Sequence, residues 1–105
     1  MTTRIFLCDV TDVPDGQPHQ VFAAGRDDAL ALYKVDGQLY LTDDLCTHGL
    51  VSLSGGELDG KIIHCPLHGG AFDVTTGKAT EYPCKRALPT FAVEVEDGKV
   101  FGLLS

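Results

Sequence analysis

The sequence contains no tryptophan, no long hydrophobic run and few basic residues. Its 105 residues are 44% hydrophobic and 22% charged, which fits one small globular domain and excludes a disordered chain. The longest apolar runs, such as Ile5–Cys8 and Ala29–Tyr33, fall far short of the roughly 20 residues that span a bilayer. The N-terminal apolar segment meets Asp9 before it reaches the length of a signal-peptide core. We therefore expect a single cytoplasmic domain, residues 1–105, with no membrane association.

The shortage of basic residues gives the chain a strongly acidic balance. Fifteen acidic residues against eight basic ones give a formal net charge of −7. A polyanion such as DNA, or an anionic membrane surface, is repelled by such a charge, so we expect no nucleic-acid partner. A protein partner with a basic patch fits better, although acidic surfaces also keep ordinary soluble domains apart.

Turn residues and alternating patterns predict an all-β fold. Three Asp-Gly pairs, at 36–37, 59–60 and 97–98, suit the positive φ angles of tight hairpin turns. In the segment 90–96, apolar residues alternate with Ala and Glu, and no segment carries a clear helical stripe. Short antiparallel strands joined by frequent turns indicate a β-sandwich or a partly open barrel. The expected strands are Arg4–Asp9, Gln20–Ala24, Ala29–Val35, Gln38–Thr42, Lys61–His64, Ala71–Asp73, Thr90–Glu96 and Lys99–Leu103.

Two loops between the expected strands carry the residues with metal-binding chemistry. One contains Cys46-Thr47-His48, and the other contains Cys65-Pro66-Leu67-His68. Each loop supplies one thiolate and one imidazole, so two soft and two borderline ligands could enclose a metal centre. A structural zinc site uses the same residue types, but its usual spacing groups Cys with Cys and His with His. A Cys46–Cys65 disulfide needs an oxidising compartment and leaves both histidines unexplained. A chance arrangement is the third alternative.

At these positions the sequence resembles the Rieske [2Fe–2S] proteins, whose pattern is Cys-x-His followed by Cys-x-x-His. Within that family it looks most like the small ferredoxins of bacterial ring-hydroxylating dioxygenase systems, through Cys46–Gly49 and the run Cys65–Lys78. The resemblance covers about 36–103. It implies a Rieske-type antiparallel β-sandwich with a smaller inserted cluster-binding subdomain at about 43–84, and one [2Fe–2S] cluster.

The resemblance also implies a role for each of the four ligands. Cys46 and Cys65 would hold one iron, and His48 and His68 would hold the other through Nδ1. With two thiolates the cluster is formally neutral when oxidised and singly negative when reduced, so it accepts an electron more readily than a four-cysteine cluster does.

The residues around the ligands indicate a potential at the low end of the Rieske range, about −150 mV. High-potential members carry a loop disulfide, and Val51 and Leu67 stand at those positions here. They also carry hydroxyl donors where this chain has Gly70 and Phe72. Hydroxyl donors stabilise the more negative reduced cluster, so their absence lowers the potential.

No phosphate-binding, dinucleotide-binding or hydrolase motif occurs in the sequence. A cluster whose protein ligands are all supplied has no open position for substrate, which favours electron transfer over catalysis. The resemblance implies a flavoprotein ferredoxin reductase as donor and a Rieske non-haem iron oxygenase as acceptor, with the carrier a monomer. The alternative is a Rieske-like small subunit of a larger enzyme such as nitrite reductase.

The remaining cysteines and histidines have no partner at metal-ligand spacing. We expect Cys8 and Cys84 to be free buried thiols. His19 and His64 are expected to be structural or exposed. Pro83 is expected to belong to a proline loop over the cluster, as the resemblance implies. The many carboxylates are interpreted as a solvated face.

Overall fold

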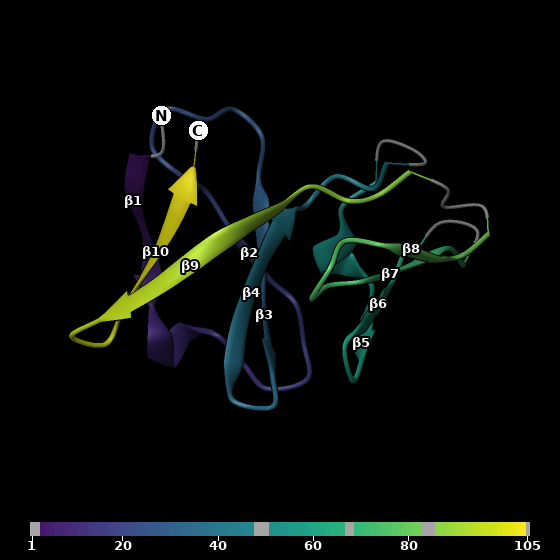
Figure 1. Cartoon of the computed structure of the whole chain (residues 1–105), viewed down its shortest axis with the longest axis horizontal. Coiled ribbons are helices and arrows are strands. Elements are labelled where there is room, and N and C mark those ends of the chain that lie inside the picture. Colours follow the sequence, from purple (N-terminus) through teal and green to yellow (C-terminus); the bar gives the residue numbers. More distant parts are fainter. Residues whose placement is uncertain (1–2, 48–50, 67–68, 83–85, 105) are drawn as a thin grey trace.

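The computed structural model describes residues 3–47, 51–66, 69–82 and 86–104, which form two antiparallel sheets lying side by side (Figure 1). The larger sheet has the strand order β1-β10-β9-β4-β3-β2 and the smaller one the order β5-β6-β7-β8. The strands of the larger sheet are β1 (Thr3–Asp9), β2 (His19–Val21), β3 (Leu30–Val35), β4 (Gln38–Asp43), β9 (Thr90–Glu96) and β10 (Lys99–Leu104). Those of the smaller sheet are β5 (Glu57–Asp59), β6 (Ile62–His64), β7 (Ala71–Asp73) and β8 (Ala79–Glu81). The prediction of an all-β fold is confirmed.

All three Asp-Gly hairpins form where the sequence predicts them. They connect β3 to β4, β5 to β6, and β9 to β10. Asp36 and Gly37 both have positive φ, at 51° and 79°, and Asp97 and Gly98 repeat the pattern at 53° and 75°. Two consecutive positive φ angles are the requirement of a type I′ hairpin, and Asp-Gly meets it at little steric cost.

The eight predicted strands are present, and the structure adds two short ones. Strands β5 and β8 have three residues each and lie at the two edges of the smaller sheet. Both are mostly exposed, so neither shows the apolar alternation that identifies a half-buried strand. Strand β2 ends at Val21, shorter than predicted, and a turn closed by the Arg26 N–H and the Ala23 carbonyl follows it.

Strand β3 is buried on both faces, which explains its continuous apolar run. Leu30 and Leu32 belong to the first hydrophobic core, whereas Ala31 and Tyr33 belong to the second. A half-buried strand would alternate between apolar and polar residues. Here β3 lies between two cores, so every one of these four residues is apolar or aromatic.

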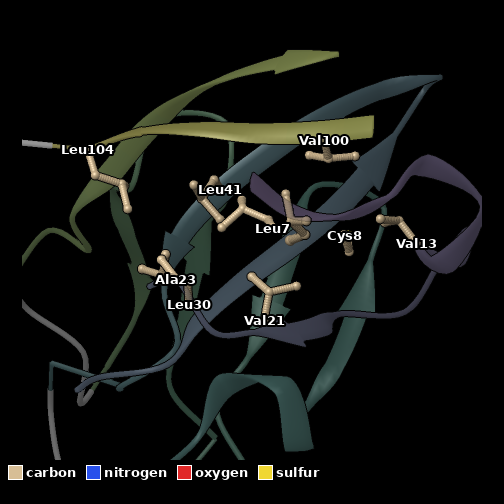
Figure 2. Close-up of a cluster of buried hydrophobic side chains, with 10 residues drawn as sticks. Leu7, Cys8, Val13, Val21, Ala23, Leu30, Leu41, Val100 and Leu104 are labelled. Carbon is tan, nitrogen blue, oxygen red and sulfur yellow. The ribbon is translucent and has the colours of Figure 1, made fainter. Parts of the chain in front are cut away.

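The first core is formed mainly by side chains of the larger sheet, and Figure 2 shows them gathered in one cluster. It also holds the thiol of Cys8, which is free and buried as predicted. Burial, followed by the charges of Asp12 and Asp9, raises the pKa of Cys8 to about 11. The thiol is therefore protonated at neutral pH and acts as a small apolar side chain. Cys84 lies outside the described residues.

Gly56 is a position beside the smaller sheet that leaves no space for a side chain. It follows a short 3-10 helix, η2 (Leu53–Gly55), and a Cβ at this position would overlap the carbonyl oxygen of His64 in β6. A Cβ on the preceding Gly55 would meet no atom within 4 Å. Gly56 is therefore required for the close approach of this turn to the strand that leads to Cys65.

We expect Gly56→Ala to destabilise the protein by about 1–3 kcal/mol, the usual cost of overpacking. For a domain of this size that is a fall of at least about 4 °C in melting temperature. Gly55→Ala is the matched control and should melt close to the unsubstituted protein. Equal melting temperatures for the two variants in a thermal scan would contradict the prediction.

Candidate metal centre

Cys46 lies in a hairpin loop that follows β4. Its backbone N–H donates to the carbonyl of Val51 at 2.9 Å, and Leu45 and Ser52 form an antiparallel bridge beside it. At the base of the loop the N–H of Leu53 donates to the carbonyl of Asp44 at 2.6 Å. Backbone hydrogen bonds to the far side of the loop therefore hold Cys46 in the segment that follows β4.

Cys65 occupies the same position in a second hairpin loop, between β6 and β7. The last pair of the ladder is His64 and Ala71, and the N–H of Cys65 donates to the carbonyl of Gly70 at 2.6 Å. In both loops, therefore, a cysteine N–H bonds the carbonyl five residues later. The other two predicted ligands, His48 and His68, lie outside the described residues.

Both cysteines are buried in the same hydrophobic core. Cys46 is 2% exposed and Cys65 is 3% exposed. They share the second core with buried apolar side chains from η2, β6 and β7, namely Leu53, Ile63 and Phe72. Two thiol side chains brought by equivalent loops into one apolar environment fit the cysteine half of a [2Fe–2S] site.

The segment 86–88 is hydrogen-bonded to the Cys46 loop. The hydroxyl of Thr47 donates to the carbonyl of Arg86 at 3.0 Å, and the N–H of Leu88 donates to the carbonyl of Gly77 at 2.7 Å. Leu88 is buried in the same core as the two cysteines. The segment 86–88 is therefore fixed between the first cysteine loop and the turn after β7. Pro83, predicted to belong to this covering loop, lies outside the described residues.

The turn after β7 is organised by the side chain of Asp73. Its Oδ1 accepts hydrogen bonds from the N–H and the hydroxyl of Thr75, at 2.9 and 2.6 Å, and its Oδ2 lies 3.4 Å from the Lys61 ammonium. Burial alone would raise the pKa of Asp73, but the Thr75 hydrogen bonds and Lys61 outweigh it and lower the pKa below its ordinary value. The carboxylate form therefore stabilises the turn that carries Gly77.

Asp44 corrects the expectation that the carboxylates form a solvated face. It is 2% exposed, and its carboxylate accepts hydrogen bonds from Gln20 and Ser54. The sequence offers no periodic pattern in this loop that would identify a buried carboxylate. Its position two residues before Cys46 is the one available signal, and position alone does not reveal burial.

Comparison with known proteins identifies the family. The profile of the Rieske [2Fe–2S] domain matches residues 3–92. The chain belongs to the Rieske family. Ferredoxin CarAc from Metapseudomonas resinovorans is 46% identical over 90% of this chain and 88% of its own length. The solved structure of the Sphingomonas yanoikuyae B1 ferredoxin superposes with a TM-score of 0.93 and 45% identity, covering 98% of this chain and all of that one.

A further solved structure contains a similar ferredoxin together with an oxygenase. It is described as a complex of reduced oxygenase and oxidised ferredoxin in carbazole 1,9a-dioxygenase. The matched chain superposes on this Rieske domain with a TM-score of 0.88 and 44% identity, covering 95% of this chain and 92% of that one.

Two negative findings apply to the described part of this Rieske domain. Over residues 3–47, 51–66, 69–82 and 86–104, no group of three or more His, Cys, Asp or Glu side chains is arranged around one point to hold a metal ion. Over the same residues, no helix is long and apolar enough to cross a membrane.

Because the folded pKa of Asp73 lies below the unfolded one, its contribution to stability is complete above the unfolded pKa and is lost as pH falls through the folded pKa. We expect Asp73→Asn to melt below the unsubstituted protein at pH 7, with the gap narrowing as pH falls below about 4. Thermal scans from pH 7 to pH 3 measure this gap. The exposed Asp27→Asn should show no comparable pH dependence, and a gap for Asp73→Asn that stays constant with pH would rule out the ionic role.

Proposed function

We propose that this chain is a one-electron carrier that takes electrons from a flavoprotein ferredoxin reductase and passes them to a Rieske non-haem iron oxygenase that hydroxylates aromatic rings. The observation that carries the proposal is the similarity to ferredoxin components of such systems, at 44–46% identity over 84–95% of each chain. One similar ferredoxin has been solved in complex with its oxygenase.

The proposed cluster has one iron held by Cys46 and Cys65 and the other held by His48 and His68. The equivalent positions of the two cysteines in their loops support the first pair. When bound, the cluster supplies reversible one-electron transfer and no position for substrate. We assign its binding to a subdomain at about 43–84, which includes all four strands of the smaller sheet.

Association with the two partners is proposed to be brief and assisted by charge. The net charge of −7 favours partners with a basic docking surface and speeds encounter at low ionic strength. A carrier that alternates between two partners works best as a monomer in the cytoplasm, where both partners are reached by diffusion. The alternative, a permanently held small subunit of a larger reductase, predicts co-purification in a tight complex.

Electron paramagnetic resonance of the dithionite-reduced protein tests the ligand assignment. We expect a Rieske-type signal, with an average g value below that of four-cysteine ferredoxins, together with two iron and two sulfide per chain. His68→Ala should abolish this signal. His64→Ala changes a histidine only four residues away that is not a proposed ligand, and it should keep the signal.

Two results would contradict the proposal in different ways. An unchanged cluster signal in His68→Ala would remove the ligand assignment. A silent sample that contains one zinc ion and no sulfide would make this protein a structural zinc module and remove the electron-transfer function.

A further inference from the structure

The carboxylate of Asp44 is enclosed by neutral hydrogen-bond donors. Its Oδ2 accepts from the Gln20 side-chain amide at 2.8 Å and from the Ser54 hydroxyl at 3.1 Å, and its Oδ1 accepts from the Ser54 N–H at 2.8 Å. Within the described part of the chain, no basic side chain lies within ion-pair distance of it. The neighbouring Asp43 differs, because its Oδ1 lies 3.3 Å from the Arg26 guanidinium.

These hydrogen bonds connect three parts of the molecule. Gln20 belongs to β2, the edge strand of the larger sheet, and Ser54 belongs to η2, which follows the Cys46 loop. The main chain of Asp44 closes the base of that loop through its carbonyl. Asp44 lies two residues before Cys46. Its side chain therefore connects the two ends of the Cys46 loop to each other and to β2 of the larger sheet.

The charge of Asp44 acts differently from the charges on the surface. Solvent and salt screen an exposed carboxylate within about 10 Å, but they screen a buried one much less. The donors to Asp44 are neutral, and among the described residues no counter-charge in contact with it cancels its field. A cluster bound by Cys46 would be held two residues along the chain from this carboxylate. Repulsion between the carboxylate and an added electron would disfavour reduction.

We propose that Asp44 is a positioning residue for Cys46 and that its buried negative charge lowers the reduction potential of the cluster. The inference rests on the proposed Rieske ligand set and goes beyond it, because it gives a residue outside the ligand motif control over the potential.

Redox titration of the cluster-loaded protein at pH 7 tests the inference with two independent changes of charge. Asp44→Asn removes the buried charge, and the Gln20 amide can turn to accept from the new amide group. We expect about a tenfold larger equilibrium constant for reduction, which for a one-electron couple is about 59 mV. Asp28→Asn is the matched control, since it removes an exposed charge near the same loop, and it should shift the potential much less.

Gln20→Lys provides the second change. Gln20 is exposed in an edge strand, so lysine fits there and places its ammonium beside the Asp44 carboxylate. We expect the potential to rise in this variant as well, whereas Gln38→Lys, with the same change of net charge at another exposed position, should leave it nearly unchanged. If Asp44→Asn binds no cluster, the comparison of Gln20→Lys with Gln38→Lys alone tests the inference.

The outcomes separate the inference from the function on which it rests. A Rieske signal in the unsubstituted protein, with equal potentials for each variant and its control, would overturn the role of Asp44 and leave the carrier function intact. The absence of any Rieske signal in the unsubstituted protein would overturn both. A rise confined to Asp44→Asn and Gln20→Lys, with unchanged g values, is the result we expect.

Discussion

The burial of β3 on both faces links the two halves of this molecule. Leu30 and Leu32 pack into the core of the larger sheet, while Ala31 and Tyr33 pack into the core that holds the cysteines. The one polar group on this buried stretch, the Tyr33 hydroxyl, lies 2.9 Å from the Thr42 hydroxyl and so keeps a hydrogen-bond partner. Burial raises the pKa of Tyr33, so this hydroxyl stays neutral. Because β3 contributes side chains to both cores, it joins the core that holds the two cysteines to the larger sheet.

Main-chain hydrogen bonds hold the two cysteines in place in the absence of a bound cluster. Each N–H of Cys46 and Cys65 bonds the carbonyl five residues later, and each loop closes onto a paired stretch of chain. Main-chain hydrogen bonds therefore hold both cysteine backbones, and at the first loop the side chain of Asp44 adds hydrogen bonds to Gln20 and Ser54. Such preorganisation would limit the change of cysteine geometry between the oxidation states of a bound cluster, and a small change favours rapid electron transfer.

The sequence is sufficient to predict the parts of the fold that depend on local chemistry. The hairpins at Asp36-Gly37 and Asp97-Gly98 follow from the positive φ angles that these residues adopt, and the strand β9 follows from its alternating residues. The edge strands β5 and β8 are not predictable in this way, since they owe their existence to pairing with β6 and β7. The burial of Asp44 is likewise not predictable from local sequence, because it depends on Gln20 and Ser54, which are distant from it in the chain.

The effect of a carboxylate in this protein depends on whether it is exposed or buried. The carboxylates that meet Arg4 on the larger sheet are more than half exposed, so solvent and salt screen them and their contribution to stability is small. Asp44 is different, since burying a carboxylate among neutral donors costs desolvation free energy that its three hydrogen bonds offset only in part. An apolar side chain together with an apolar partner at this place would avoid that cost. Stability alone does not explain a buried negative charge two residues before Cys46, whereas the proposed role in lowering the reduction potential does.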